Sequence, residues 1–292
     1  MRAGREVAIV GAGALGTVFA AAAERAGLDT VMCARSRVPA LVLERDDGAH
    51  TLDVPVVDDP SAAGPAGWVL VTTKAQDTAA TGPWLKRLCG RETVVVVVQN
   101  GVEHRANAEP LAGPATVLPA LAYIAAERVA PGRVVHRRGS RVVVEAGPAG
   151  VAFAEQWAPA GLDVVLEPDF RTAAWRKLLS NVAANPITAL TSRRMEVLRE
   201  PKVRGLASTL LAETVAVGIA EGARLGPGDV DETLAFYDGF AESDGTSMLY
   251  DRLAGRPLEH ESINGVVVRL GRRHGVPTPA NEALCALLGA VG

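Results

Sequence analysis

Hydrophobic positions follow two different patterns along this chain. In the first half, short runs of aliphatic and β-branched residues alternate with polar turns, which is typical of buried strands. The longer runs lie at 6–10, 30–34, 68–74, 93–98 and 115–129. Shorter runs at 133–136 and 141–145 predict further strands, and the short connections from 115–129 through these runs predict antiparallel additions at a sheet edge. The run 162–166 predicts a last strand.

From about residue 171 onward, apolar residues recur at helical spacing instead. This pattern predicts long helices over 206–224 and 229–240 and further helices that begin near 244 and 259. The pattern changes at Glu167-Pro168-Asp169. The chain is therefore predicted to have two domains, an α/β domain over 1–167 and a helical domain over 168–292.

A glycine-rich turn follows the first predicted strand. Gly11-Ala12-Gly13-Ala14-Leu15-Gly16 has the spacing G-x-G-x-x-G, and an alanine-rich helix follows it to about Ala26. In a strand–turn–helix setting, this spacing allows a tight turn, a close approach of backbone to a pyrophosphate, and close packing of helix on strand. The unpaired N–H groups at the helix start favour phosphate. The motif predicts a Rossmann-like dinucleotide-binding domain.

The end of the second predicted strand bears on the choice of dinucleotide. An NAD-specific site usually has an acidic residue there, which accepts the ribose 2′-hydroxyl. This chain has Arg35-Ser36-Arg37 instead. Two cations and a hydroxyl suit a 2′-phosphate, so NADPH is predicted, with Arg35 as the better candidate. The alternative is that one or both arginines simply face solvent.

Two further polar residues follow predicted strands. Lys74 ends the run 68–74, and Asn100 lies in Gln99-Asn100-Gly101, directly after the run 93–98. Parallel strands of such folds bind ligands at their carboxyl ends. Each residue taken alone is equally well explained as a surface cation or a turn former.

A polar stripe lies in the segment 175–186. Lys177, Asn181 and Asn185 are spaced i, i+4, i+8, so they share one face of a predicted helix whose other residues are mostly apolar. A lysine and two amides on a largely buried helix suggest a cleft for a small polar molecule. The competing interpretation is a helix at a domain boundary with chance polar residues.

Composition restricts the class of protein. The chain has 292 residues, is 48% hydrophobic and 22% charged, and carries a formal net charge of −3, which favours neither nucleic acid nor an anionic membrane. Its three cysteines have no metal-ligand spacing, so a reduced cytoplasmic location and no metal site are predicted. The uncharged stretch 7–23 resembles a signal peptide, but Glu6 and the glycines argue against that interpretation. No later run approaches the ~20 apolar residues of a membrane span.

Taken in order, these motifs resemble the ketopantoate reductase (2-dehydropantoate 2-reductase) family over nearly the whole chain. The resemblance rests on the glycine motif and on Thr73-Lys74-Ala75, Gln99-Asn100-Gly101, Trp175-Arg176-Lys177-Leu178, Asn181, Asn185-Pro186, Ser247-Met248-Leu249 and Glu259…Ile263-Asn264-Gly265. It implies a Rossmann-like domain followed by an all-helical domain of the 6-phosphogluconate dehydrogenase C-terminal type. It also implies reduction of 2-dehydropantoate to pantoate with NADPH, a small-molecule 2-oxo acid as substrate, and a role in pantothenate biosynthesis.

The resemblance assigns roles by position. Lys177 matches the general acid, and Glu259 matches the carboxylate that orients substrate and cofactor; sequence physics alone does not separate Glu259 from Glu261. Substrate-binding positions are Asn100, Asn181, Asn185, Asp244 and Ser247. Cofactor-binding positions are Gly11, Ala12, Gly13, Ala14, Leu15, Gly16, Arg35, Lys74, Asn100, Ala126 and Glu259.

Two departures from the family pattern leave the substrate open. Asp244 stands where the family commonly has asparagine, and its carboxylate either repels a carboxylate substrate or points away. Leu118-Pro119-Ala120 replaces a more usual glycine-containing turn. The alternatives are a reductase of another 2-oxo acid and, on the same scaffold, a non-catalytic NADP-binding protein. The apolar helix over 206–224 serves either as core or as the interface of a homodimer.

Overall fold

The computed structural model describes residues 5–291, which divide into two compact units. Unit 1 comprises Met1–Gln99 and Glu103–Phe170, and unit 2 comprises Asn100–Val102 and Arg171–Gly292. The change of unit after Phe170 falls three residues beyond the predicted domain boundary at 167. The segment Asn100–Val102 belongs to the helical unit although it follows a strand of the sheet.

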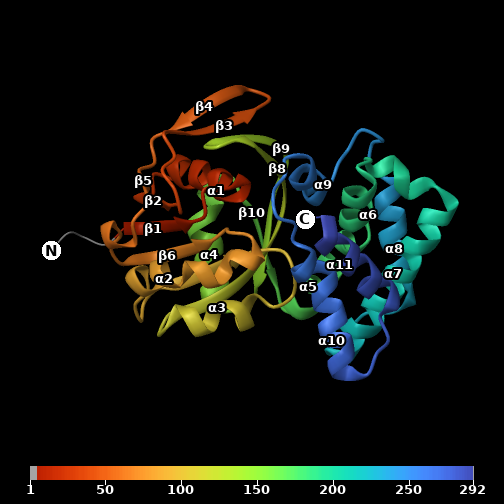
Figure 1. The fold of residues 1–292 in the computed structure, drawn as a ribbon. Coiled ribbons are helices and arrows are strands. Elements are labelled where there is room, and N and C mark those ends of the chain that lie inside the picture. The colour runs from red at the N-terminus through yellow and green to blue at the C-terminus, as the bar shows by residue number, and fades with distance from the viewer. Residues whose placement is uncertain (1–4, 292) are drawn as a thin grey trace. The chain divides into compact units, whose positions relative to one another are not determined.

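Unit 1 is built on a ten-stranded sheet in the order β4-β3-β9-β8-β7-β6-β1-β2-β5, with β10 also paired to β9 (Figure 1). The strands are β1 (Arg5–Val10), β2 (Thr30–Cys33), β3 (Leu41–Arg45), β4 (Gly48–Leu52), β5 (Val56–Val57), β6 (Ala66–Val71), β7 (Val94–Val98), β8 (Thr116–Ala130), β9 (Arg133–Glu145) and β10 (Asp163–Glu167). The run β8-β7-β6-β1-β2 is parallel throughout. The predicted strand over 68–74 therefore ends earlier, at Val71.

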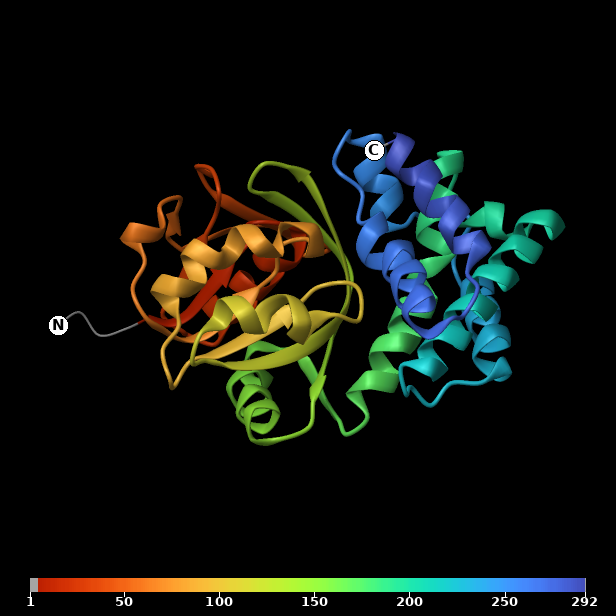
Figure 2. The same cartoon turned by 60° about the horizontal axis from the view of Figure 1, so that its bottom comes forward.

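Helices cover both faces of this sheet. They are α1 (Ala14–Arg25), α2 (Gly82–Leu88), α3 (His104–Ala112) and α4 (Pro148–Trp157). Val96 and Val98 of β7 join the apolar cluster formed with α1 and α4, whereas Val95 and Val97 join the cluster formed with α2 and α3. Figure 2 shows α2 and α3 side by side on one face. Burial on both faces explains why β7 consists of valine alone.

The structure corrects two sequence predictions about the sheet. The runs 133–136 and 141–145 form one strand, β9, because Gly139 at φ 85° lets the strand bulge rather than end. The antiparallel pairing of β8 with β9 is confirmed, but β9 is not at an edge. The hairpin β3–β4 lies beyond it and was not predicted, although Asp46-Asp47-Gly48 is a turn sequence and Gly48 has φ 125°.

Unit 2 is helical, as predicted. Its helices are α5 (Phe170–Val182), α6 (Ala184–Thr191), α7 (Pro201–Ala220), α8 (Pro227–Asp238), α9 (Ser247–Leu253), a π-helical turn (Glu261–Gly265), α10 (Val266–His274) and α11 (Pro279–Val291). The predicted single helix through 175–186 is wrong, because it is broken at Ala183 between α5 and α6. Pro186 explains the break, since it has no N–H to bond the carbonyl of Val182.

Helix α7 has seven buried residues, and Leu206 and Ile219 on it are exposed. By length and composition it is the one helix within residues 5–291 that could cross a membrane, although no such run was predicted. Its buried residues are Ala207, Leu210, Leu211, Thr214, Val215, Val217 and Gly218. Gly218 faces Trp175 so closely that a Cβ there would lie 3.1 Å from the indole ring. One face of α7 therefore lies in the core of unit 2, with Trp175 of α5 packed against it, and the expectation of a dimer interface on the other face stays a prediction.

Candidate active site

The glycine turn of unit 1 has no room for side chains at two of its three glycines. Gly11 has φ 124°, and a Cβ there would lie 2.8 Å from the backbone nitrogen of Thr73. A Cβ on Gly16 would overlap the carbonyl oxygen of Gly11. Gly13 instead faces open space, where a Cβ would meet no atom within 4 Å. Protein atoms therefore crowd the turn at Gly11 and Gly16, whereas the side at Gly13, called its open front below, is free for a ligand to approach the backbone.

Helix α1 begins at the open side of this turn. Gly13 is its N-cap and offers no side chain to the first N–H groups, and no acidic residue lies in the first turn. Ala12, Ala14 and Leu15 remain partly exposed around it. A helix start with uncapped N–H groups, a positive dipole end and a glycine surface fits the pyrophosphate of a dinucleotide.

The other cofactor candidates of unit 1 are Lys74, Arg35 and Ala126, which come from three different segments. Thr73 lies against Gly11 of the glycine turn, and Lys74 is the next residue along the chain. Arg35 is exposed, with its guanidinium 3.8 Å from the carboxylate of Asp77. Ala126 on β8 packs against the apolar cluster that also takes in Ala12, Ala14 and Leu15. Lys74 therefore lies near the glycine turn, whereas the contacts of Arg35 and Ala126 are with Asp77 and with this apolar cluster.

Gln99 was not singled out from the sequence, yet it holds the Lys74 segment in place. Its Nε2 donates to the carbonyl of Thr73 at 3.0 Å, and its Oε1 accepts from Thr78 Oγ1 at 3.0 Å. The ring of His104 bonds the Gln99 carbonyl at 2.9 Å, and burial lowers the pKa of His104 to about 4. The imidazole is therefore neutral and structural. Only the neighbouring position of Gln99 and Asn100 in the sequence hinted at this role.

In unit 2, helix α5 directs consecutive residues to different surroundings. Trp175 and Leu178 are buried in the core. Arg176 pairs with Asp229 at 2.9 Å, and Asp229 also accepts from the N–H of Gly226 at the start of α8. Lys177 lies on neither of these sides. The residues Trp175, Arg176 and Leu178 therefore fix α5 in its unit.

The amine of Lys177 has unusual acid–base properties. Burial lowers its pKa from 10.5 to about 8, because the ammonium loses hydration. At neutral pH the amine is mostly protonated, but it releases its proton far more readily than an exposed lysine does. This is the property of a general acid that must donate near physiological pH.

Two amides and a carboxylate from three separate segments form a hydrogen-bonded chain that includes Asn181 of the stripe. Asn181 Nδ2 donates to Asn100 Oδ1 at 3.4 Å, and Asn100 Nδ2 donates to Glu259 Oε2 at 3.2 Å. Glu259 is buried, whereas Glu261 is exposed. The structure therefore separates the two glutamates that the sequence left equivalent, because only Glu259 is buried and accepts a hydrogen bond from Asn100.

Asn185 lies on α6, after the break, and is only 3% exposed. Its Nδ2 atom is buried and has no hydrogen-bond partner among the described residues. A buried amide donor without an acceptor costs free energy, on the order of 1–3 kcal/mol. Such an atom is a candidate contact for a bound acceptor such as a carboxylate or hydroxyl.

The segment that carries Ser247 is attached to α6. Thr246 caps α9 by accepting from the N–H of Leu249 at 3.2 Å, and its hydroxyl bonds that of Thr188 at 2.7 Å. Thr188 follows Asn185 by three residues, so Ser247 and Asn185 are held on joined helices. Asp244 accepts from the N–H of Ala241 at 3.1 Å, which engages its carboxylate in the preceding turn.

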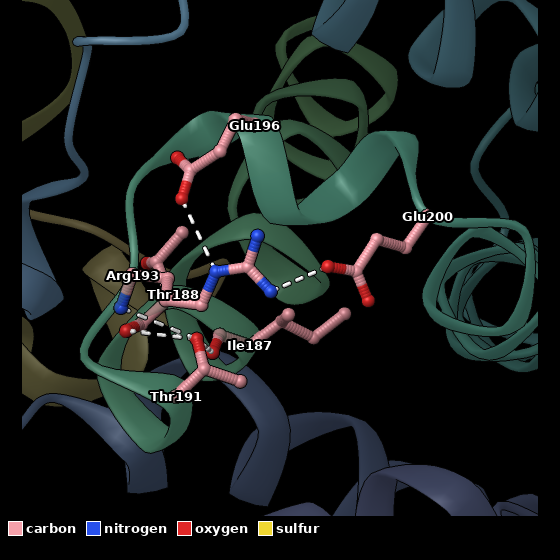
Figure 3. Close-up of polar contacts among 6 residues, drawn as sticks. All are labelled: Ile187, Thr188, Thr191, Arg193, Glu196 and Glu200. Atoms are coloured by element: carbon pink, nitrogen blue, oxygen red, sulfur yellow. Dashed lines mark hydrogen bonds and ion pairs between the residues drawn. The ribbon is translucent and has the colours of Figure 1, made fainter.

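The far end of α6 is fixed by its own polar contacts, which Figure 3 shows. Thr191 Oγ1 donates to the carbonyl of Ile187 at 2.7 Å and accepts from the N–H of Arg193 at 3.3 Å. The Arg193 guanidinium bridges Glu196 and Glu200. The helix that carries Asn185 is thereby anchored at both ends.

A group of potential metal ligands also forms in unit 2, although the sequence predicted none. The ligand atoms of His260, Glu261 and Cys285 lie within 4.8 Å of one another. Cys285 follows Glu261 by 24 residues, so no local spacing indicated the group. Burial and Glu261 raise the pKa of Cys285 to about 11, and the thiol donates weakly to Glu261 at 3.8 Å.

Comparisons with known proteins agree along the whole chain. Family models described as ketopantoate reductase PanE/ApbA and its C-terminal part match residues 7–149 and 169–292. The 2-dehydropantoate 2-reductase of Mycobacterium tuberculosis is 42% identical over 287 residues, covering 97% of each chain.

Solved structures give the same result. A PanE/ApbA family ketopantoate reductase from Ralstonia eutropha has a TM-score of 0.91 at 31% identity, covering 98% of each chain. A dimeric ketopantoate reductase from Staphylococcus aureus has a TM-score of 0.88 at 28% identity, also covering 98% of each chain. The predicted fold class, a Rossmann-like domain followed by a helical domain, is confirmed.

Proposed function

Because the chain belongs to the ketopantoate reductase PanE/ApbA family, we propose that it reduces ketopantoate to pantoate with NADPH. The observation that carries the proposal is the set of polar groups in unit 2. Helix α5 carries a lysine with a lowered pKa and the first amide of a bonded amide–amide–carboxylate chain, and α6 carries a buried amide that lacks an acceptor among the described residues. This set offers a proton donor and contacts for an oxygen-rich substrate.

The glycine turn of unit 1 fits the proposed cofactor. Its open front at Gly13 and the uncapped start of α1 receive the pyrophosphate, and Arg35 and Lys74 supply cations for the remaining phosphate charge. Ala126, which has no bulk beyond its methyl group, leaves room for the nicotinamide. When bound, NADPH supplies the hydride that adds to the 2-oxo carbon.

Lys177 then acts on the oxygen of the reacting carbonyl. Negative charge develops on that oxygen as the carbon is reduced, and an ammonium beside it stabilises the charge and transfers its proton. With a pKa of about 8, the amine is protonated before the reaction and releases the proton without a large penalty. Glu259, held by Asn100, orients the substrate and cofactor.

The other polar residues are proposed to hold the substrate. Ketopantoate has a carboxylate and a hydroxyl besides its oxo group, and the amides of Asn181 and Asn185 and the hydroxyl of Ser247 can bond both. The buried Nδ2 of Asn185 gains the acceptor that it lacks. Asp244 contributes through its turn, since its carboxylate accepts from Ala241.

Asp244 also favours a second candidate, reduction of a different 2-oxo acid. A carboxylate at this position adds negative charge near Ser247, where the family commonly has a neutral amide. A substrate with an additional donor group at that end would be preferred over ketopantoate. Asp244→Asn would then reverse the ranking of kcat/KM between the two oxo acids.

The deciding experiment measures NADPH oxidation with ketopantoate and with a panel of other 2-oxo acids, repeated with NADH. Rapid turnover of ketopantoate with a preference for NADPH supports the proposal. Turnover of another oxo acid alone supports the second candidate. Binding of NADPH without turnover of any oxo acid contradicts both.

We also propose a cytoplasmic homodimer. The three cysteines are free thiols, as in a reducing compartment. A dimeric relative is known from S. aureus. Leu206 and Ile219 of α7 and Phe236 of α8 are exposed large apolar residues of unit 2. Light scattering coupled to size exclusion measures the mass, and a monomer at micromolar concentration contradicts the dimer.

A further inference from the structure

The break between α5 and α6 separates the two amides of the polar stripe, and buried side chains fill it. Pro186 cannot donate to the carbonyl of Val182. Asn264 takes its place, with Nδ2 donating to Val182 O at 2.9 Å. Asn264 is completely buried, at 0% exposure. The carbonyl that the proline deprives of its helical partner is therefore satisfied from another segment.

A second side chain enters the break from α8. Tyr237 OH donates to the carbonyl of Leu179 at 2.9 Å. The N–H groups of Ala184 and Ala183 bond the same hydroxyl and lower its pKa, although burial raises that pKa overall. A hydroxyl inserted into the ladder of helical hydrogen bonds is a known cause of helix kinks.

Asn264 is itself held by a buried polar network. Its Nδ2 also donates to Asn281 Oδ1 at 3.0 Å. Asn281 in turn donates to the carbonyl of Leu210 at 3.3 Å and to Glu213 Oε2 at 2.8 Å. The network joins α5, the π-helical turn, α11 and α7. Asn264 therefore cannot move without breaking contacts at several helices.

The break affects the proposed site because it lies between two of its amides. Asn181 precedes it and Asn185 follows it, whereas in an unbroken helix the two would be related by about 40° and 6 Å. Asn264 also lies in the π-helical turn that begins two residues after Glu259. The buried amide of Asn264 thus contacts the break between Asn181 and Asn185 and also belongs to the turn that follows Glu259.

We propose that Tyr237 and Asn264 are positioning residues, which set the relative orientation of the Asn181 and Asn185 amides and so the affinity for the oxo acid. This inference rests on the proposed function of those amides as substrate contacts. Neither residue touches the substrate in this account. They act by fixing a backbone break that the proline alone permits but does not shape.

The test uses the full-length chain and the variants Asn264→Leu, Tyr237→Phe and Asn264→Leu combined with Pro186→Ala. The Pro186→Ala change restores an N–H that can bond Val182 O. In the double variant the Val182 carbonyl therefore has a hydrogen-bond partner again, but the wild-type geometry of the break is not restored. Thr233→Val is the matched control, because it removes a buried hydroxyl bond of 2.7 Å to the Asp229 carbonyl within α8. The measurements are the KM for the oxo acid, kcat, the Kd of pantoate by calorimetry, the Kd of NADPH and the urea midpoint.

Asn264→Leu should raise the KM and the pantoate Kd by about tenfold or more, in line with the effect of misplaced binding groups. Tyr237→Phe should raise them about fivefold. Both variants should leave the NADPH Kd unchanged and lower kcat less than they raise KM. The double variant should regain the urea midpoint of wild type while its pantoate Kd stays raised. Thr233→Val should lower only the urea midpoint.

Wild-type pantoate affinity in both Tyr237→Phe and the double variant would overturn the inference, and it would do so even if Asn264→Leu fails to fold. A double variant that regains pantoate affinity together with stability would also overturn it, because hydrogen-bond satisfaction alone would then be sufficient. Failure of the proposed function appears differently, as wild-type protein that neither binds pantoate nor reduces ketopantoate. In that case the series is measured on the oxo acid that wild type does reduce.

Discussion

The two units present their candidate binding groups in different ways. Unit 1 presents mainly backbone: one turn of six residues, closed behind by the absence of side chains at Gly11 and Gly16 and open in front at Gly13. Unit 2 presents side chains from distant segments, namely Asn100, α5, α6 and the turn at Glu259. A backbone site tolerates almost no substitution at its glycines. In a side-chain site, the positions of the functional groups depend on the packing of the helices that carry them.

The largest effect should come from the side-chain site. Lys177→Ala should lower kcat by about 10³-fold, because it removes both the proton donor and the charge that stabilises the developing alkoxide. The Kd of NADPH should not change. Stopped-flow measurement of NADPH oxidation checks both values.

Arg176→Ala is the matched control for Lys177→Ala. It removes the adjacent cation of the same helix, which pairs with Asp229 rather than facing the polar stripe. Its kcat should stay close to that of wild type. A Lys177→Ala enzyme within about tenfold of wild type would remove the lysine from the mechanism, since general acids contribute more than this.

The backbone site gives the next largest effect and can be divided into two parts. Gly16→Ala places a methyl group against the Gly11 carbonyl, so it should lower both the urea midpoint and NADPH affinity. Gly13→Ala meets no protein atom within 4 Å, so stability should be unchanged. NADPH affinity should still fall, by about 100-fold, because the backbone can no longer approach the pyrophosphate closely.

For both glycine variants, fluorescence titration gives the Kd of NADPH, and unfolding in urea gives the stability. Equal NADPH affinity in Gly13→Ala and wild type would show that the front of the turn is not the binding surface.

The same difference explains what the sequence could predict. The glycine turn is contiguous, so its spacing alone indicated its structure, and the parallel strands β1, β2, β6 and β7 followed from buried runs. The pairing of Asn100 with Glu259 spans 159 positions and has no local pattern. Family resemblance, rather than residue physics, selected Glu259 over Glu261.

The sequence missed features in which a side chain compensates for a local disruption. Pro186 indicated a helix boundary, yet the spacing of Lys177, Asn181 and Asn185 favoured one helix through it. The partner that makes the break stable, Asn264, lies 82 residues from Val182. The runs 133–136 and 141–145 were predicted as two strands, whereas Gly139 lies between them within the single bulged strand β9.

The pH dependence of the reaction should distinguish the side-chain site from the backbone site. Lys177 is protonated below its pKa of about 8, so kcat/KM for reduction should be level at lower pH and fall about tenfold per unit above it. Oxidation of pantoate needs the neutral amine, so its kcat/KM should rise through the same range. NADPH binding should not follow either curve, and identical profiles in the two directions would contradict the assignment of Lys177.

The smallest effect should come from the cation at the edge of unit 1. Arg35 is 83% exposed and 3.8 Å from Asp77, so solvent screens its contribution. Arg35→Ala should lower kcat/KM for NADPH about tenfold and leave the value for NADH unchanged, because only NADPH carries the 2′-phosphate. Arg37→Ala, the matched exposed cation two residues on, should change neither value. A loss in Arg37→Ala with none in Arg35→Ala would move the phosphate contact along the loop. Equal losses of kcat/KM for NADPH and NADH in Arg35→Ala would instead place Arg35 at a part that both dinucleotides share, such as the pyrophosphate.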